Sequence, residues 1–370
     1  MNEVKSRLPR QVFTGIRDSY VKGIQSIYRK DGTDTTSIGS VGTIVPSRAD
    51  RGKGILNLRA DTRNMTDFLI DVFICGQREI QNGDDTVFPG NKTRLSVRVF
   101  VSDKVLPYLM ERAEASGIDV EAMIKINNAN RVDWMVYLGY NSPTRRVPEE
   151  EMQAHTEFLR SIANIASNPR DIKEMFGTTI SAGYGIYTFE GSESVERINQ
   201  LGTSIGMISP LISTTFGYDS KSAEAVITNP GNVITVGLKG NVPVGFCAIE
   251  RTAIEVENYG KLKIAELTDV VVANGITHGP HYGDNNGNNL YFALTTSALT
   301  HMARAREQNE YTIFGEYTLT HKTAARASAH QGQILCGILP LHADVGGKLT
   351  TFAAMSVPNE SLLILKEAMR

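Results

Sequence analysis

The sequence has little cysteine, little tryptophan and no long apolar run. Its 370 residues include 3 cysteines and 1 tryptophan. So few, widely separated cysteines argue against a disulfide framework or a structural zinc site and are typical of a reducing compartment. No run approaches the roughly 18 apolar residues that a membrane-spanning helix requires, and the N-terminal segment, MNEVKSRLPRQVF, lacks the apolar core of a secretory signal. We therefore expect a soluble, cytoplasmic protein with no membrane partner.

An excess of charge of either sign is also missing. The sequence has 38 Lys and Arg residues against 40 Asp and Glu residues, a formal net charge of −2. Proteins that bind nucleic acid usually show a basic excess on one face, so this balance argues against a nucleic-acid partner. At roughly 150 residues per domain, the length indicates about two domains.

A turn-rich, charged segment divides the sequence at residues 141–148, NSPTRRVP. Apolar side chains recur at helical spacing over the next stretch, 149–166, and a shorter helix is expected over 171–176. We interpret these two helices as a connector. The predicted organisation is an N-terminal domain over 1–148, a helical connector over 149–180 and a C-terminal domain over 181–370.

Strand and helix patterns alternate in the N-terminal domain. Residues 94–101, RLSVRVFV, alternate as a strand does, and residues 103–116 have a helical pattern that ends at Gly117. Another strand is expected over 134–138. These patterns favour an α/β domain without defining its topology.

The C-terminal domain has a clearer order of elements, β-α-α-β-β-β-α-β-α-β-β. It includes a β-hairpin around a Lys-Gly-Asn turn at 239–241. The fold class is therefore α/β, with an α+β-type mixed sheet. The expected elements cover residues 184–189, 193–205, 220–228, 233–238, 242–249, 262–273, 289–306, 311–319, 321–331, 334–340 and 349–357.

Two segments of this domain resemble a known family. Residues 239–246, KGNVPVGF, form a hairpin with a small Val-Gly step after its turn, and residues 266–273, ELTDVVVA, belong to the following strand. Together with the order of elements over 182–360, they resemble the GNAT superfamily of acyl-CoA-dependent N-acyltransferases. The resemblance implies a GNAT-like C-terminal domain in which the fourth strand splays from the fifth.

In this superfamily, backbone groups at the end of the fourth strand bond the pantetheine arm of the donor as an added strand would. The matching stretch is Val271, Val272 and Ala273. The resemblance therefore implies acetyl-CoA or another acyl-CoA as a substrate, with no metal.

The phosphate loop of the family is degenerate in this sequence. Residues 283–290 read GDNNGNNL, where Gly287 matches the central glycine and Asn288 or Asn289 is a suitable helix N-cap. Asp284 stands where the family has Arg or Gln, which places a negative charge near a diphosphate.

A second segment resembles that loop outside the C-terminal domain. Residues 47–55, SRADRGKGI, hold Arg51 and Gly54 at the family spacing. Too few residues precede them for a complete domain of this fold. Three interpretations stay open: a truncated second copy, a different anion-binding turn, or an exposed basic loop.

N-acyl transfer requires a base that deprotonates the amine and groups that stabilise the tetrahedral oxyanion. Glu266 is the first candidate base because it interrupts an apolar central strand, and Glu316 on the next strand is the second. His321 begins a helix near the expected thioester and is a candidate base or oxyanion donor. Ser328 stands where the family often has the tyrosine that protonates the leaving thiolate. The structural alternatives are salt bridges for the carboxylates and helix-start hydrogen bonding for His321.

Other reactive residue types have simpler interpretations. His278, His281 and Asp284 are suitable metal ligands, but the glycines and proline around them favour a flexible lid. Cys247 and Cys336 lie in apolar strands and are interpreted as small buried hydrophobic residues.

The leading hypothesis is an acyl-CoA-dependent N-acyltransferase, most simply an acetyltransferase, that acts on an amine of a small molecule. Two alternatives stay open. A carrier protein or another thioester replaces free acyl-CoA in the first, because Asp284 and Ser328 depart from the family pattern. The second is a catalytically silent GNAT-like module for sensing or assembly. A homo-oligomer is compatible with each.

Overall fold

The structure is a computed structural model of the whole chain, which forms two compact units. The first unit comprises Met1–Pro148, Ile254–Lys261 and Gly337–Ala343, and the second comprises Glu149–Ala253, Leu262–Cys336 and Asp344–Arg370. The residues that the structure describes are 36–38, 42–44, 53–60, 63–82, 94–126, 133–165, 167–216, 219–256, 260–273, 290–304, 311–320, 322–345 and 348–370.

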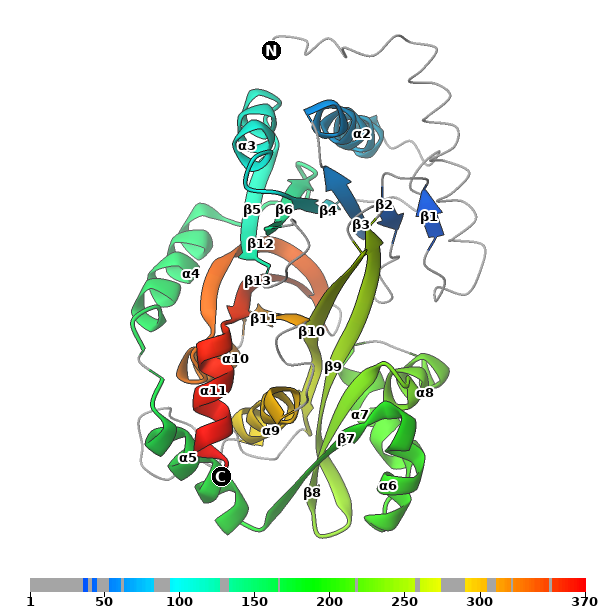
Figure 1. The fold of residues 1–370 in the computed structure, drawn as a ribbon, viewed down its shortest axis with the longest axis vertical. Helices are drawn as coiled ribbons and strands as arrows, with labels where there is room; N and C mark the ends of the chain where they lie inside the picture. The colour runs from blue at the N-terminus through cyan, green and yellow to red at the C-terminus, as the bar shows by residue number, and fades with distance from the viewer. Residues whose placement is uncertain are drawn as a thin grey trace. The chain divides into compact units, whose positions relative to one another are not determined.

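The chain is a mixed α/β protein with mixed sheets, as the sequence predicts (Figure 1). In the first unit the strands lie in the order β1-β2-β3-β4-β6-β5, and the middle of β12 follows β5. The described elements of this unit are β1 (Thr36–Ile38), β2 (Gly42–Ile44), β3 (Lys53–Ala60), α2 (Arg63–Asn82), β4 (Arg94–Val101), α3 (Leu106–Ala115), β5 (Asp119–Lys125) and β6 (Trp134–Asn141).

A parallel pair of strands forms part of the first unit. β3 pairs with β4 from Lys53↔Arg94 to Ala60↔Val101, and α2 is the crossover between them. β6 pairs antiparallel with both β4 and β5. The strands predicted at 94–101 and 134–138 and the helix predicted at 103–116 are confirmed by β4, β6 and α3. The sequence patterns did not predict β3, α2 or β5.

The structure describes only the last part of the segment 47–55. Lys53 and Gly54 lie in β3 and pair with β4, so these two residues belong to a strand rather than to a loop. Arg51 and Gly52 lie outside the described residues. The segment also differs from a phosphate loop because a strand follows it, where a phosphate loop leads into a helix.

The core of the first unit packs α2 and α3 against β4 and β6. Leu69 and Phe73 of α2 are four residues apart and share one helix face. Val97 and Val99 of β4 alternate toward the same cluster. Burying each such side chain contributes on the order of 1.5–3 kcal/mol. The even-numbered residues of β4, which include Arg94, therefore point to the opposite face of the sheet.

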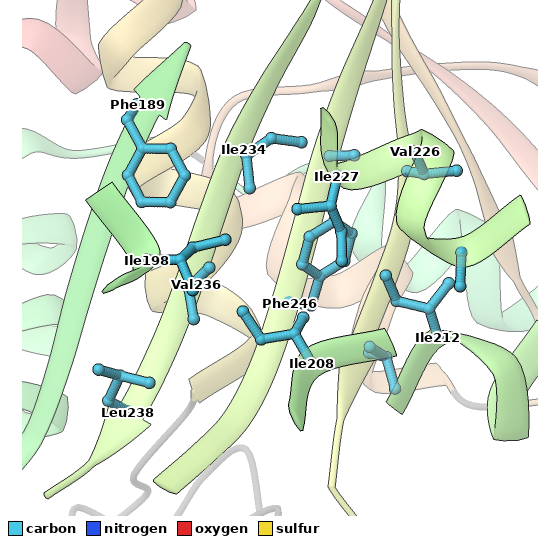
Figure 2. Packing of buried hydrophobic residues seen from close by; sticks show 13 residues of the cluster. Phe189, Ile198, Ile208, Ile212, Val226, Ile227, Ile234, Val236, Leu238 and Phe246 are labelled. Carbon is cyan, nitrogen blue, oxygen red and sulfur yellow. The ribbon is translucent and has the colours of Figure 1, made fainter. Parts of the chain in front are cut away.

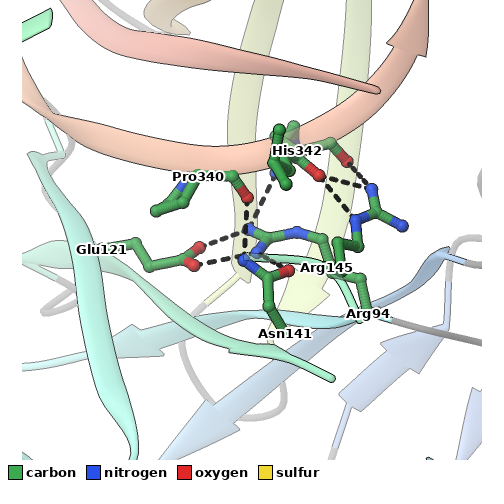
Figure 3. Close-up of polar contacts among 7 residues, drawn as sticks. Arg94, Glu121, Asn141, Arg145, Pro340 and His342 are labelled. Carbon is green, nitrogen blue, oxygen red and sulfur yellow. Dashed lines mark hydrogen bonds and ion pairs between the residues drawn. The ribbon is translucent and has the colours of Figure 1, made fainter. Parts of the chain in front are cut away.

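Arg94 is buried on that opposite face, where an ion pair and hydrogen bonds compensate its charge (Figure 3). Its Nη1 and Nη2 donate to the two carboxylate oxygens of Glu121 at 3.0 and 2.5 Å. Nη1 also donates to Asn141 Oδ1 at 2.9 Å, and Nη2 lies 3.1 Å from His342 Nδ1. A Cβ at Gly139 would lie 1.9 Å from the Glu121 carboxylate, so glycine makes room for the ion pair.

Arg145 is also buried in the first unit and satisfies backbone carbonyls of β12 (Figure 3). Its Nε donates to Leu341 O at 2.8 Å, and its Nη2 donates to Leu341 O and, at 3.2 Å, to His342 O. Leu341 has a φ of 41°, which is uncommon for a residue other than glycine. The guanidinium therefore binds the backbone at the residue of β12 that has a positive φ.

In the second unit the strands lie in the order β12-β13-β11-β10-β9-β8-β7. The predicted hairpin is confirmed by β8 and β9, and the predicted helix at 220–228 by α8. α7 and α11 were not predicted. The elements are α4 (Glu149–Ile162), α5 (Pro169–Ser181), β7 (Tyr184–Glu190), α6 (Ser194–Gln200), α7 (Ile205–Phe216), α8 (Ser220–Thr228), β8 (Asn232–Lys239), β9 (Val242–Val256), β10 (Gly260–Val272), α9 (Leu290–Arg304), β11 (Tyr311–Thr318), α10 (Lys322–His330), β12 (Ile334–Val345), β13 (Lys348–Val357) and α11 (Asn359–Ala368).

The single helix predicted over 193–205 is wrong. α6 ends at Gln200, and α7 begins at Ile205. Gly202 between them has a φ of 72°, a left-handed conformation that glycine adopts without steric cost. Val195, which shares the helical apolar spacing of this stretch with Ile198, is 51% exposed, whereas Ile198 is buried. The apolar spacing of the sequence continues across this break, so periodicity alone did not reveal it.

The central strands of the second unit carry helices on both faces. Ile234 and Val236 of β8 belong to a buried cluster with residues of α6, α7 and α8 (Figure 2). Neighbouring residues of a strand point to opposite faces. Gly237 accordingly lies on the other face, where Leu290 and Leu294 of α9 would come within 3.3 Å of a Cβ at this position.

Replacing Glu121 by Gln is expected to destabilise the first unit by about 3–5 kcal/mol, because the buried guanidinium of Arg94 would lose its counter-charge. Urea unfolding followed by tryptophan fluorescence measures this loss, since Trp134 in β6 is the single tryptophan of the sequence. The matched control is Glu114→Gln, at an exposed carboxylate of α3, which should change stability by less than about 0.5 kcal/mol. Equal stability of the two variants would contradict the proposed role of the ion pair.

Candidate active site

Two parallel strands of the second unit part before they end. β10 and β11 pair from Lys263↔Tyr311 to Leu267↔Gly315. β10 continues to Val272 and β11 to Thr318, and no further pairing joins these described residues. We call the two segments that do not pair with each other, 268–272 of β10 and 316–318 of β11, the splay. The pairing of β11 with β13 extends along its side of the splay, to Thr318↔Phe352.

Asp269 marks the point where β10 turns away. Its φ of 50° lies in the left-handed region, which Asp tolerates better than most residues. A single residue of this conformation bends a strand and interrupts its pairing. The position of Asp269, two residues after the last pair with β11, therefore explains the splay locally.

The far end of β10 remains bound to β9. The N–H of Ala273 donates to Val244 O at 2.9 Å. Because successive residues of a strand present their N–H groups to opposite sides, the N–H of Val272 points away from β9 and toward the splay. Val271 is buried in the cluster with α6, α7 and α8, while Val272 and Ala273 are half-buried. The three residues predicted to bind the donor thus lie along the splay or at its end.

The first turn of α9 lies beside this end of β10. Gly237 and Gly245 are directly paired in β8 and β9. A Cβ at Gly245 would lie 2.7 Å from Leu294 Cδ1, 3.3 Å from Leu290 Cδ2 and 3.4 Å from Val271 O. The paired glycines therefore let α9 approach closely, with its N-terminus next to the splay.

Several predicted site residues lie outside the described residues. The predicted loop residues Gly287, Asn288 and Asn289 are among them, as is Asp284. His321, His278 and His281 are outside as well. Within the described part of the chain, no group of three or more His, Cys, Asp or Glu side chains could hold a metal ion, and no helix is long and apolar enough to cross a membrane.

The two candidate carboxylates share one face of the sheet. Glu266 pairs with Phe314, and paired residues of neighbouring strands point to the same face. Glu316 follows Phe314 by two residues and therefore points to that face as well. Both carboxylate side chains are half-buried, and each has a partner in the structure. The sheet thus brings Glu266 and Glu316 to the beginning of the splay.

Tyr317 lies on the opposite face and was missed by the sequence analysis. The residue is buried, and its hydroxyl donates to Gln333 Oε1 at 2.7 Å. The Ser328 hydroxyl, which lies close to that of Tyr317, donates to Ala324 O at 3.1 Å. Ser328, the candidate taken from the family position, is therefore fully buried beside a tyrosine of the neighbouring strand.

A chain of buried amides extends from Tyr317 to α9. Gln333 Nε2 donates to Gln331 Oε1 at 3.2 Å, and Gln331 Nε2 donates to Thr295 Oγ1 at 2.7 Å and Thr296 Oγ1 at 2.9 Å. Every residue in this series of hydrogen bonds is buried. The sequence signal was the pair of glutamines around Gly332, directly after an alanine-rich helix.

Burial raises the pKa of the Tyr317 hydroxyl. Burial, and then the nearby charge of Asp269, raise the pKa of the Cys247 thiol. Both groups are therefore neutral at physiological pH. The interpretation of Cys247 as a buried hydrophobic residue is confirmed. The same interpretation of Cys336 is wrong, because this residue is only half-buried and its Sγ lies 3.4 Å from Ser356 Oγ.

No protein-family model and no curated protein matches the sequence. Three solved structures illustrate what the chain is similar to. Arabidopsis thaliana NAA60 in complex with a bisubstrate analogue is 12% identical, with a TM-score of 0.33, over 47% of this chain and 97% of that chain. Ribosomal-protein-alanine N-acetyltransferase from Brucella melitensis is 15% identical, with a TM-score of 0.32, over 47% and 98%. An acetyltransferase of the GNAT family from Streptococcus pneumoniae is 13% identical, with a TM-score of 0.31, over 47% and 98%.

The matched region of each of these acetyltransferases covers about half of this chain. At these identities the likeness concerns the fold alone.

Replacing Tyr317 by Phe is expected to cost about 0.5–1.5 kcal/mol of stability near pH 8, because the bond to Gln333 is lost. A folded-state pKa above the unfolded value of about 10 means that stability is present below pH 10 and falls as the pH rises further. The variant should therefore lose stability less steeply above pH 10, by up to about 1.4 kcal/mol per pH unit.

Urea unfolding at several pH values between about 8 and 11 measures this difference. The control is Tyr187→Phe, at a tyrosine that is 41% exposed. Cys247 is present in both variants and contributes equally to their pH dependence. Parallel pH profiles of Tyr317→Phe and the unmodified protein would contradict the assignment.

Proposed function

We propose that the second unit is an acyl-CoA-dependent N-acyltransferase, most simply an acetyltransferase, that acts on an amine of a small molecule. The observation that carries this proposal is the end of the β10–β11 pairing at Leu267↔Gly315. Beyond it, backbone groups of β10 face a neighbour that has moved away. The pantetheine arm of an acyl-CoA contains two amides, which can occupy the vacated side as an added strand would.

In this proposal Val272 supplies the backbone N–H for the arm, flanked by Val271 and Ala273. The diphosphate of the donor lies at the N-terminus of α9, where the backbone N–H groups of the first helical turn and the helix dipole favour an anion. The close packing of Leu294 on Gly245 keeps that N-terminus near the end of β10. The loop residues Gly287, Asn288 and Asn289 would complete the anion site.

The reaction needs a neutral amine nitrogen that attacks the carbonyl carbon of the thioester. We assign Glu266 as the base that accepts the amine proton, with Glu316 on the same face as the second candidate and His321 as the third. The tetrahedral intermediate then breaks its C–S bond. The leaving thiolate takes up a proton from solvent, and Glu266 releases to solvent the proton that it accepted from the amine. Ser328 can reach the sulfur only by giving up its bond to Ala324 O, so its assigned role is a hydrogen bond rather than proton transfer.

Replacing Val272 by Pro is expected to weaken acetyl-CoA binding at least about tenfold, because proline removes the N–H that faces the splay while the bond from Ala273 to Val244 stays. Val272→Ala keeps that N–H and should weaken binding less than about threefold. Calorimetric titration of the whole chain with acetyl-CoA, with desulfo-CoA as a reference ligand, measures both. Equal affinities of the two variants would refute the backbone contact.

Replacing Glu266 by Gln is expected to lower kcat/KM for the amine by about 100-fold or more, while the acetyl-CoA dissociation constant stays within about threefold. The acidic limb of the pH–rate profile should disappear with the carboxylate. Glu224→Gln, at an exposed carboxylate of α8, is the control and should leave both parameters unchanged. An active Glu266→Gln enzyme with an unchanged pH profile would transfer the assignment to Glu316 or His321.

A further inference from the structure

The two units repeat one order of elements. The first unit runs β1-β2-β3-α2-β4-α3-β5-β6, and the second contains β8-β9-β10-α9-β11-α10-β12-β13. The strands of the first run lie in the order β1-β2-β3-β4-β6-β5, and those of the second in the order β8-β9-β10-β11-β13-β12. Both runs therefore exchange the positions of their last two strands.

The directions of the strands agree as well. β1–β2 and β8–β9 are antiparallel hairpins. β3–β4 and β10–β11 are parallel pairs connected through a helix, α2 in one run and α9 in the other. β4–β6 and β11–β13 are antiparallel. The same strand order and the same strand directions therefore occur twice in one chain, which points to repetition of the fold.

The two runs differ at the place that would receive the donor. β3 and β4 stay paired to their last residues, Ala60↔Val101, whereas the β10–β11 pairing stops at Leu267↔Gly315. Within the described residues of β3 there is no counterpart of Asp269, since Asp269 and Leu341 are the only residues other than glycine with a positive φ in the described part of the chain.

The connection between the parallel strands and the crossover helix also differs. In the first run only residues 61–62 separate β3 from α2, whereas 273–289 separate β10 from α9. A loop that wraps a diphosphate ahead of a helix needs several residues of backbone. The first run has neither the splay nor the length of loop that the proposed donor site uses.

We infer that the first unit is a second copy of the acyltransferase fold whose donor site is closed by the intact β3–β4 pairing. The chain consequently binds one acyl donor, in the second unit. The statement about the donor rests on the proposed function, whereas the closed pairing of the first copy is independent of it.

Hydrogen–deuterium exchange of the whole chain, with and without acetyl-CoA, tests the inference. In the free protein, the amides of 56–60 are expected to exchange at least about tenfold more slowly than those of 268–272 that face the splay, because paired amides exchange only when the sheet opens. Acetyl-CoA is expected to slow exchange in 268–272 and to leave 56–60 unchanged. Val272→Pro is the matched control and should lose the effect of acetyl-CoA in 268–272.

Fast exchange of 56–60 in the free protein, or a slowing of 56–60 by acetyl-CoA, would overturn the inference, because it would show an open or donor-binding first copy. If acetyl-CoA slows neither segment while 56–60 is already protected, the proposed function fails and the closed first copy is upheld. The two failures are therefore distinguishable in one experiment.

Discussion

Backbone hydrogen bonding between the parallel strands β10 and β11 is the constraint on which the second unit depends. A strand inside a sheet has a neighbouring strand on each side. A backbone N–H or C=O group that loses its partner strand costs free energy unless water or a ligand binds it. β10 keeps β9 as a partner to its very end, through Ala273, but leaves β11 at Leu267. The residue that makes this possible is Asp269, whose left-handed conformation bends the strand without ending it. The candidate donor site is thus a property of the main chain, and the side chains around it support its shape.

Much of the second unit could be predicted because its signals are local. The hairpin of β8 and β9 follows from a turn between two alternating strands, and the helices α8 and α9 follow from regular apolar spacing. The splay was expected only through the resemblance to a family, since nothing in the pattern ELTDVVVA marks Asp269 as the bend. Tyr317 was missed because its partners, Gln333 and Gln331, are distant from it along the chain and were not counted as core residues. The topology of the first unit escaped prediction because β3 begins with a Gly- and Lys-rich segment that is typical of loops.

The two units contain buried polar centres of different kinds. In the first, the charge of Arg94 is compensated by Glu121, and removing either partner leaves a charge in a medium of low polarity. In the second, the hydrogen-bond network from Tyr317 to Thr295 and Thr296 contains only neutral groups. Breaking one of its bonds therefore costs less free energy than breaking the ion pair, and its geometry is kept over a wide pH range. This neutral network lies on the face of the sheet opposite to the candidate carboxylates Glu266 and Glu316.

The paired glycines Gly237 and Gly245 have a consequence for the evolution of this fold. Their missing side chains are replaced by Leu290 and Leu294 of α9, which fill the same volume from the other side. A relative with alanine at position 245 would need a smaller residue than leucine at position 294. These positions should therefore covary in natural sequences, and their joint signature would identify members of the group even where the residues of the catalytic face have diverged.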